Sequence, residues 1–187
     1  MRLSTLALAL ALAIGSMLPT PAHATSQVLL SQTELATESA AVIRGTIGEQ
    51  KVVLPPEWKR PITQTEVRVA EVLYGKAPMT VVVEQIGGEW GGETLYVAGD
   101  AKLKPGEEVV LFLMERDGHW LLTAMEQSKY TVEATLAGPA LHRDLTSGFF
   151  LRGPEGRLKA VDDLHDPEVR LEDMVKLLNE IEEGGAQ

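Results

Sequence analysis

The stretch Thr63–Gly75, TQTEVRVAEVLYG, decides the fold of this 187-residue chain. Every second residue falls on one side of an extended backbone: Thr65, Val67, Val69, Glu71 and Leu73. Such a period of two predicts a β-strand, and Gly75 predicts its end. The chain around this strand is therefore expected to supply the rest of a sheet.

Short β-rich runs separated by turn residues follow on the C-terminal side. They are MTVVVEQI (79–86), ETLYVA (93–98) and EEVVLFLM (107–114), then HWLLTAMEQSKYTVE (119–133) as a strand pair or one bent strand, and GFFLRGPEGRLKAV (148–161) as a hairpin. Pro105-Gly106 marks the turn before the third run. Turns at this spacing predict a mainly β fold, a small antiparallel OB-like barrel of five strands rather than a sandwich.

One helix is expected at each end of this sheet. On the N-terminal side, Ser31 and Glu34 have capping-box spacing and predict a short helix near Gln32–Glu38, followed by a strand over 40–47. Near the C-terminus, Asp166 as N-cap and Pro167 at the first helical position predict an amphipathic helix over 167–183. Its apolar stripe is expected to pack on the barrel: Leu171, Met174, Val175, Leu178 and Ile181.

Residues 1–24 are expected to form a signal peptide. Arg2 precedes a long apolar run, two prolines follow, and Ala22-His23-Ala24 provides an A-x-A cleavage site. Cleavage after Ala24 by the Sec route predicts a secreted or periplasmic protein, with residues 25–187 as a single domain and no membrane insertion after cleavage.

The composition excludes several function classes. The chain has no cysteine, so neither disulfides nor thiol chemistry is expected. Its formal net charge of −10 repels phosphate backbones and anionic membranes, so no nucleic-acid partner is expected.

The glycine-rich segment QIGGEWGGETLYV (85–97) is interpreted as the turn of a β-hairpin. Phosphate-binding glycine loops have the spacing G-x-G-x-x-G or end in G-K-[ST], and they lead into a helix. GGEWGG has neither spacing and leads into a β-rich run. Trp90 within it is expected either to cap the barrel or to contact a partner.

Four segments together resemble an uncharacterised family of secreted bacterial proteins. They are RVAEVLYGKAP (68–78), GGEWGG (87–92), VAGDAKLKPGEEVVLFL (97–113) and AMEQSKYTV (124–132). The resemblance implies an OB-type barrel similar in architecture to the tissue inhibitors of metalloproteinases. Ser128 stands where the pattern implies glycine, and the mature chain begins at Thr25 rather than at the cysteine with which those inhibitors chelate zinc.

No catalytic, cofactor or metal site is expected. His119, His142 and His165 lie outside any two-ligand spacing. His142, Asp144 and Ser147 lie within one short segment, which is interpreted as a polar turn because triads are assembled from distant segments. A Glu71–Glu84 pair on neighbouring strands is the one carboxylate arrangement that a hydrolase could use.

The loop PPEWKRP (55–61) is the strongest candidate for a binding site. OB barrels often contact ligands through the connection of their first two strands. Prolines hold Trp58, Lys59 and Arg60 in this loop, and these residues with Trp90 are the predicted partner-binding residues. The alternative is a Trp58 that packs on the barrel rim. The function expected is a non-enzymatic module that binds a protein or peptide; a protease inhibitor, a hydrolase and an oligosaccharide-binding protein remain alternatives.

Overall fold

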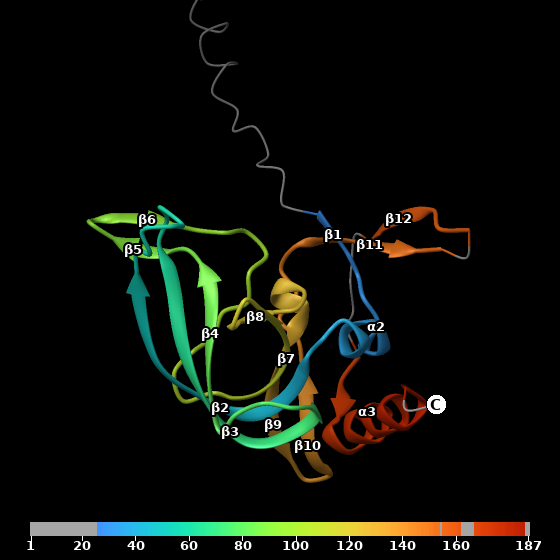
Figure 1. Cartoon of the computed structure of the whole chain (residues 1–187). Coiled ribbons are helices and arrows are strands. Elements are labelled where there is room, and N and C mark those ends of the chain that lie inside the picture. Colours follow the sequence, from blue (N-terminus) through green and yellow to red (C-terminus); the bar gives the residue numbers. More distant parts are fainter. Residues whose placement is uncertain (1–25, 154, 162–166, 186–187) are drawn as a thin grey trace, which may run out of the picture.

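The central feature of the computed structural model is a ring of five hydrogen-bonded strands. The structure describes residues 26–153, 155–161 and 167–185. The ring contains β2 (Ala41–Val53), β3 (Ile62–Gly75), β4 (Thr80–Ile86), β7 (Glu108–Arg116) and β8 (His119–Leu122). Pairing runs β2–β3–β4–β8–β7 and returns to β2; only β4–β8 is parallel. This Greek-key ring confirms the OB-like barrel (Figure 1).

The sheet can close into a ring because bulges in the pairing of β2 with β3 bend these strands. Ile43 lies opposite Val72 whereas Gly45 lies opposite Val69, so β3 carries an extra residue there. Gly45 permits the bend, since a Cβ at this position would lie 2.5 Å from the carbonyl oxygen of Arg68. The bulges also change which side chains face inward. Val67 and Val69 are buried as expected, but Glu71 is exposed.

The first residues of β2 and the middle of β7 are buried on both faces, which explains the continuous apolar run of β7. Alternate side chains fill the barrel interior, among them Ile43, Val109 and Leu111. The intervening side chains, including Val42 and Phe112, pack in a second core beneath the helices. The barrel therefore has an inner core and an outer core on one flank.

The run 119–133 forms two strands, as one of its two interpretations predicts. β8 is followed by a 3-10 turn, η2 (Met125–Ser128), and then by β9 (Lys129–Thr135), which pairs with the first half of β7. β9 continues past the barrel into β10 (Gly138–His142) and β13 (Val169–Arg170). Ser128 is buried and its hydroxyl accepts a hydrogen bond from the amide of Ala124 at 2.6 Å, so serine closes this turn.

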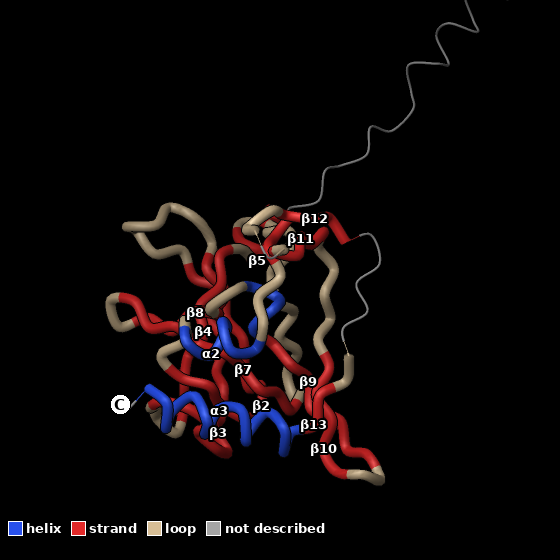
Figure 2. Tube along the Cα trace, turned by 90° about the vertical axis from the view of Figure 1, so that its right-hand side faces the viewer, coloured by secondary structure: helices blue, strands red, loops and turns tan. Residues whose placement is uncertain are grey.

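Two helices cover the outer core. α2 (Gln32–Thr37) has the predicted capping box between Ser31 and Glu34. α3 (Leu171–Gly185) begins at Leu171 rather than at Pro167, because Val169 and Arg170 pair with β10 instead. Asp166, the expected N-cap, lies outside the described residues. Three of the stripe residues are buried, and Val175 and Ile181 are partly buried. Figure 2 shows α3 lying along the sheet.

Two small sheets lie outside the barrel. β1 (Ser26–Val28), β11 (Gly148–Arg152) and β12 (Leu158–Val161) form one, so the predicted hairpin over 148–161 is present but does not belong to the barrel. β5 (Gly88–Trp90) and β6 (Glu93–Leu95) form the other. β6 is shorter than the strand over 93–98 that the sequence predicts. The predicted signal peptide and the predicted cleavage site lie outside the described residues.

Candidate functional site

The loop between β2 and β3 is a tight turn with one strained residue. The carbonyl oxygen of Pro55 accepts hydrogen bonds from the amides of Trp58 and Lys59, each at 3.1 Å. Lys59 has φ 52°, in the left-handed region that favours glycine. The loop is therefore ordered by its own backbone, as the prolines predict.

Trp58 packs on the barrel rim. Its side chain is half-buried, and its ring centroid lies 6.4 Å from that of His119 with a tilt of 57°. His119 begins β8, directly after the Asp117-Gly118 turn of the β7–β8 hairpin. In OB barrels the connections of strands 1–2 and 4–5 are the common ligand-binding loops. Trp58 and His119 bring these two connections into contact.

A polar network fixes His119 in place. Nδ1 of His119 lies 2.9 Å from Oε2 of Glu84, and Nε2 of Gln64 donates to Oε1 of Glu84 at 2.7 Å. Both carboxylate oxygens of Glu84 are thus engaged. Glu71 lies opposite Arg44 of β2, beyond the paired part of β4, so the two glutamates do not form an acid–base pair.

The glycine-rich segment forms the predicted hairpin. Gly91 and Gly92 have φ values of 62° and 84° and form its two-residue turn, with Trp90 opposite Glu93. A Cβ on Gly88 would lie 2.7 Å from Val52 Cγ2, so the missing side chain lets the hairpin lie against β2. Trp90 is 47% exposed and therefore is not a buried cap of the barrel.

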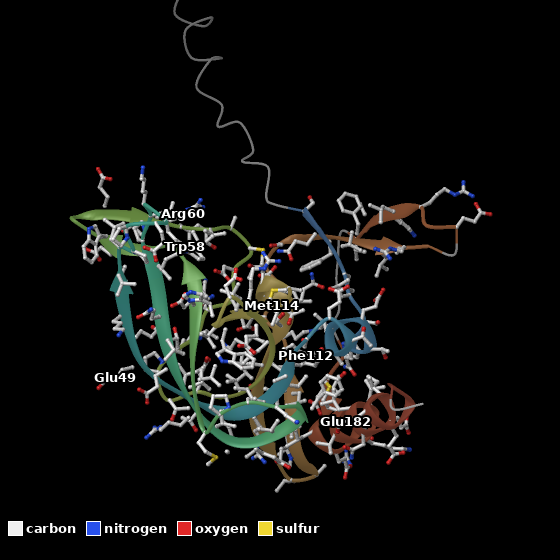
Figure 3. All side chains as sticks on the ribbon, in the orientation of Figure 1. Glu49, Trp58, Arg60, Phe112, Met114 and Glu182 are labelled. Carbon is white, nitrogen blue, oxygen red and sulfur yellow. The ribbon has the colours of Figure 1, made fainter. Side chains whose placement is uncertain are left out.

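The hairpin and the 54–61 loop share one end of the barrel. The amide of Gly87 donates to the carbonyl oxygen of Pro61 at 2.8 Å, and Figure 3 shows Trp58 and Arg60 beside β5. The elements that carry the four predicted residues therefore share this end, the loop with Trp58, Lys59 and Arg60 and the hairpin with Trp90. We call the following set the barrel-end surface: Leu54, Trp58, Lys59, Arg60, Trp90, Leu95 and Tyr96.

Sequence reasoning missed the aliphatic members of this surface, Leu54 and Leu95. Leu95 and Tyr96 fall in a segment predicted to be a barrel strand, where alternate residues would be buried; in the structure Tyr96 is 68% exposed. Lys59 and Arg60 form no ion pair with any residue that the structure describes. Exposed aromatic side chains beside two cations make this surface suited to binding rather than to packing.

The remaining sequence candidates do not assemble a reactive site. Nε2 of His142 lies 3.6 Å from Glu133 and 3.7 Å from Glu168, whereas the hydroxyl of Ser147 accepts from Gln27 at 3.4 Å. The segment is thus a polar turn with separate partners. Among the described residues no three His, Asp or Glu side chains are grouped as a metal would require. No helix in that part of the chain is long and apolar enough to span a membrane.

No protein-family model matches the chain, and no curated protein matches its sequence. The resemblance to secreted bacterial proteins of the GGxxGG and PGEEVVLFL pattern therefore stays a prediction.

Proposed function

We propose that this chain is an exported, non-enzymatic binding module that recognises a protein or peptide through its barrel-end surface. The observation that carries the proposal is the convergence of two segments distant in the sequence, the 54–61 loop and the β5–β6 hairpin, at one end of the barrel. Export rests on the signal-like residues 1–24.

The composition of the barrel-end surface supports a macromolecular partner. Trp58, Trp90 and Tyr96 supply aromatic area, and Arg60 supplies a guanidinium without an ion-pair partner in the described part of the chain. Tryptophan, tyrosine and arginine are the residues in which interface energy concentrates. The ordered loop and hairpin lower the entropy lost on association.

An oligosaccharide is the second candidate ligand. The exposed rings of Trp90 and Tyr96 can stack on sugar faces, and the Gln64–Glu84–His119 network near Trp58 offers oriented polar groups. OB barrels bind oligosaccharides through the connections of strands 1–2 and 4–5, which Trp58 and His119 represent here. Inhibition of a protease without an N-terminal cysteine is a special case of the main proposal.

Site-specific crosslinking tests the proposal. Benzoylphenylalanine at Tyr96 should capture a discrete envelope protein in the producing cell, whereas the same group at Met79, which is exposed on the connection at the other end of β3, should not. Capture at Met79 alone, or at neither position, would contradict the proposal. Adducts that migrate as glycan ladders would favour the oligosaccharide instead.

Affinity for the captured partner provides the quantitative test. The double change Trp58→Ala and Arg60→Ala should weaken binding by about 2 kcal/mol, which is roughly 30-fold in Kd. A matched control, Lys76→Ala with Met79→Ala, also removes one base and one large apolar side chain but at the opposite end of β3. Equal affinities for the two double variants would show that the barrel end is not the binding surface.

A further inference from the structure

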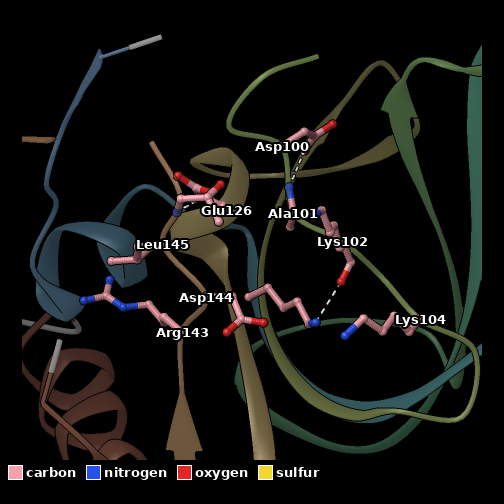
Figure 4. Close-up of a pocket in the computed structure, with 10 residues that line it drawn as sticks. Asp100, Ala101, Lys102, Lys104, Glu126, Arg143, Asp144 and Leu145 are labelled. Atoms are coloured by element: carbon pink, nitrogen blue, oxygen red, sulfur yellow. Dashed lines mark hydrogen bonds between the residues drawn. The ribbon is translucent and has the colours of Figure 1, made fainter. Parts of the chain in front are cut away.

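A polar hollow of about 400 Å³ lies on another side of the molecule, between three connecting segments (Figure 4). One wall is the β6–β7 connection, with Asp100, Lys102 and Lys104. The other wall is the β10–β11 connection, with Arg143 and Asp144, and η2 and β9 contribute Glu126 and Lys129. The volume falls within the range of small-molecule sites.

Glu126 holds the two walls in a fixed relation. Its carboxylate is almost fully buried and accepts hydrogen bonds from the amide and hydroxyl of Thr146 at 3.0 and 2.7 Å, and from the amide of Ser147 at 2.8 Å. The amide of Glu126 donates to the carbonyl oxygen of Gly99 at 3.1 Å. Both walls are thus tied to η2, and the hollow is formed before any ligand arrives.

Positive charge is in excess at one end of the hollow. Lys129 is only 5% exposed, and its ammonium donates to the carbonyl oxygen of Lys102 and to Oε2 of Glu107, both at 2.7 Å. Nζ of Lys104 lies 3.7 Å from the other oxygen of Glu107. Two ammonium groups therefore share one carboxylate, and Lys129 has a third N–H beyond its two bonds.

The acid at the other end of the hollow is Asp100, whereas Asp144 lies away from it, next to Arg143 (Figure 4). Oδ1 of Asp100 accepts a hydrogen bond from the amide of Ala101 at 2.9 Å, and no cation among the described residues lies within ion-pair distance of Asp100. Burial raises the pKa of Asp100, and the hydrogen bonds from the Gln85 side chain and the Ala101 amide offset this only in part. Figure 4 shows Asp100 and Lys104 well apart, at the top and the lower right of the hollow.

We propose that this hollow binds a small zwitterion of the α-amino acid or short-peptide class. The ligand's ammonium group lies at Asp100, and its carboxylate lies at Lys104 and Lys129. Asp100 lies at one end of the hollow and the Lys104–Lys129 pair at the other, with no ion pair between them, and a molecule that carries a positive and a negative group at its two ends can contact both. The hollow is separate from the barrel-end surface, so this inference does not rest on the function proposed above.

Tri-alanine and its two capped forms test the two ends separately, since alanine adds no large side chain. Binding is followed by NMR chemical-shift titration of the chain that lacks residues 1–24. Tri-alanine should bind at least tenfold more tightly than both N-acetyl-tri-alanine, which lacks the ammonium group, and tri-alanine amide, which lacks the carboxylate. No shift of the lining residues at millimolar tri-alanine, or equal affinity for a capped form, would overturn the proposal.

Two variants assign the ends. Asp100→Asn should abolish the preference for the free over the acetylated N-terminus and leave the preference for the free carboxylate. Lys104→Ala should abolish the preference for the free carboxylate and leave the preference for the free N-terminus. The side chain of Lys104 is 65% exposed, so its loss should not unfold the chain. Lys76→Ala, an exposed lysine on the β3–β4 connection, is the matched control and should keep both preferences. If Asp100→Asn does not fold, Lys104→Ala still tests the proposal. A Lys104→Ala variant that keeps the preference for tri-alanine over tri-alanine amide would contradict the placement of the ligand carboxylate at Lys104.

Discussion

At the scale of single residues, the positions of the loop side chains at the barrel end depend on one unfavourable backbone conformation, at Lys59. Lys59 occupies a left-handed conformation that costs a residue with a Cβ about 1 kcal/mol or more. The conformation turns the chain after Trp58 and leaves Lys59 and Arg60 exposed beside it. Sequence reasoning identified this loop from its prolines and its tryptophan, but φ at Lys59 could not be read from residue types.

Lys59→Gly is expected to be more stable than Lys59→Ala by up to about 1 kcal/mol, because glycine adopts positive φ without a steric penalty. Urea denaturation measures the difference. Arg60→Gly is the control; Arg60 does not have a positive φ, and glycine there should destabilise relative to Arg60→Ala. A less stable Lys59→Gly would mean that the loop is not strained.

The neighbouring acids Glu107 and Glu108 give a second prediction at this scale. Glu107 pairs with the buried Lys129, whereas Glu108 pairs with Arg44 at 2.6 Å on the barrel surface. Glu107→Gln leaves a buried ammonium without its counter-charge and should lower the free energy of unfolding by about 3 kcal/mol. Glu108→Gln should lower it by less than about 1 kcal/mol. Equal losses in urea denaturation would contradict this ranking.

The free energy of unfolding that Glu107→Gln loses should depend on pH. Partial burial by itself raises the pKa of Glu107, but the hydrogen bond and charge of Lys129 outweigh it and hold the pKa below its ordinary value. A carboxyl group with a lowered folded pKa contributes stability above its unfolded pKa, and this contribution is lost as the pH falls through the folded pKa. The gap between wild type and Glu107→Gln should therefore be full at neutral pH and shrink below roughly pH 4. A gap that does not change with pH would show that the two residues are not an ion pair.

At the scale of elements, periodicity predicted strands well where one face is buried and poorly elsewhere. β3 and β4 agree with the sequence analysis because alternation is their main signal. β6 was expected to be longer because its residues favour strands, yet the glycines commit it to a two-stranded hairpin. β1, β10 and β13 were missed; they are short and form only because a partner strand is already present. Because β13 pairs with β10, α3 begins at Leu171 and not at the predicted Pro167.

The packing of α3 supplies the prediction at this scale. Leu178 is fully buried in the outer core with Phe112, so Leu178→Asp would place a charge in an apolar environment and should destabilise the fold by about 3 kcal/mol or more. Asn179→Asp adds the same charge on the exposed side of the helix and should change stability by less than about 0.5 kcal/mol. Thermal unfolding followed by circular dichroism measures both. A native melting curve for Leu178→Asp would show that α3 is not held on the sheet.

At the scale of the whole molecule, the strand pattern predicts a small barrel, but it does not predict how the outer sheet β1–β11–β12 is attached to that barrel. That attachment runs through buried polar side chains of η2, in the segment MEQS. The side chain of Gln127 accepts from the amide of Leu30 at 2.8 Å and donates to Gln27 at 3.2 Å and to the carbonyl oxygen of Val28 at 3.1 Å. A sequence shows a polar residue but not which distant backbone it satisfies, so these contacts could not be predicted.

Gln127→Met should therefore detach the outer sheet while the barrel stays folded. Methionine has a similar size, but it leaves the Leu30 amide and the Val28 carbonyl unsatisfied, which costs about 2 kcal/mol or more. Hydrogen exchange should become faster at β1 and β11, whereas β2, β3 and β7, which lie between the two cores, should keep their protection. Gln32→Met is the control, since the side chain of Gln32 forms no hydrogen bond within the described residues. Uniform loss of protection in Gln127→Met would show instead that the barrel and the outer sheet unfold as one unit, and that the buried amide of Gln127 supports the entire fold.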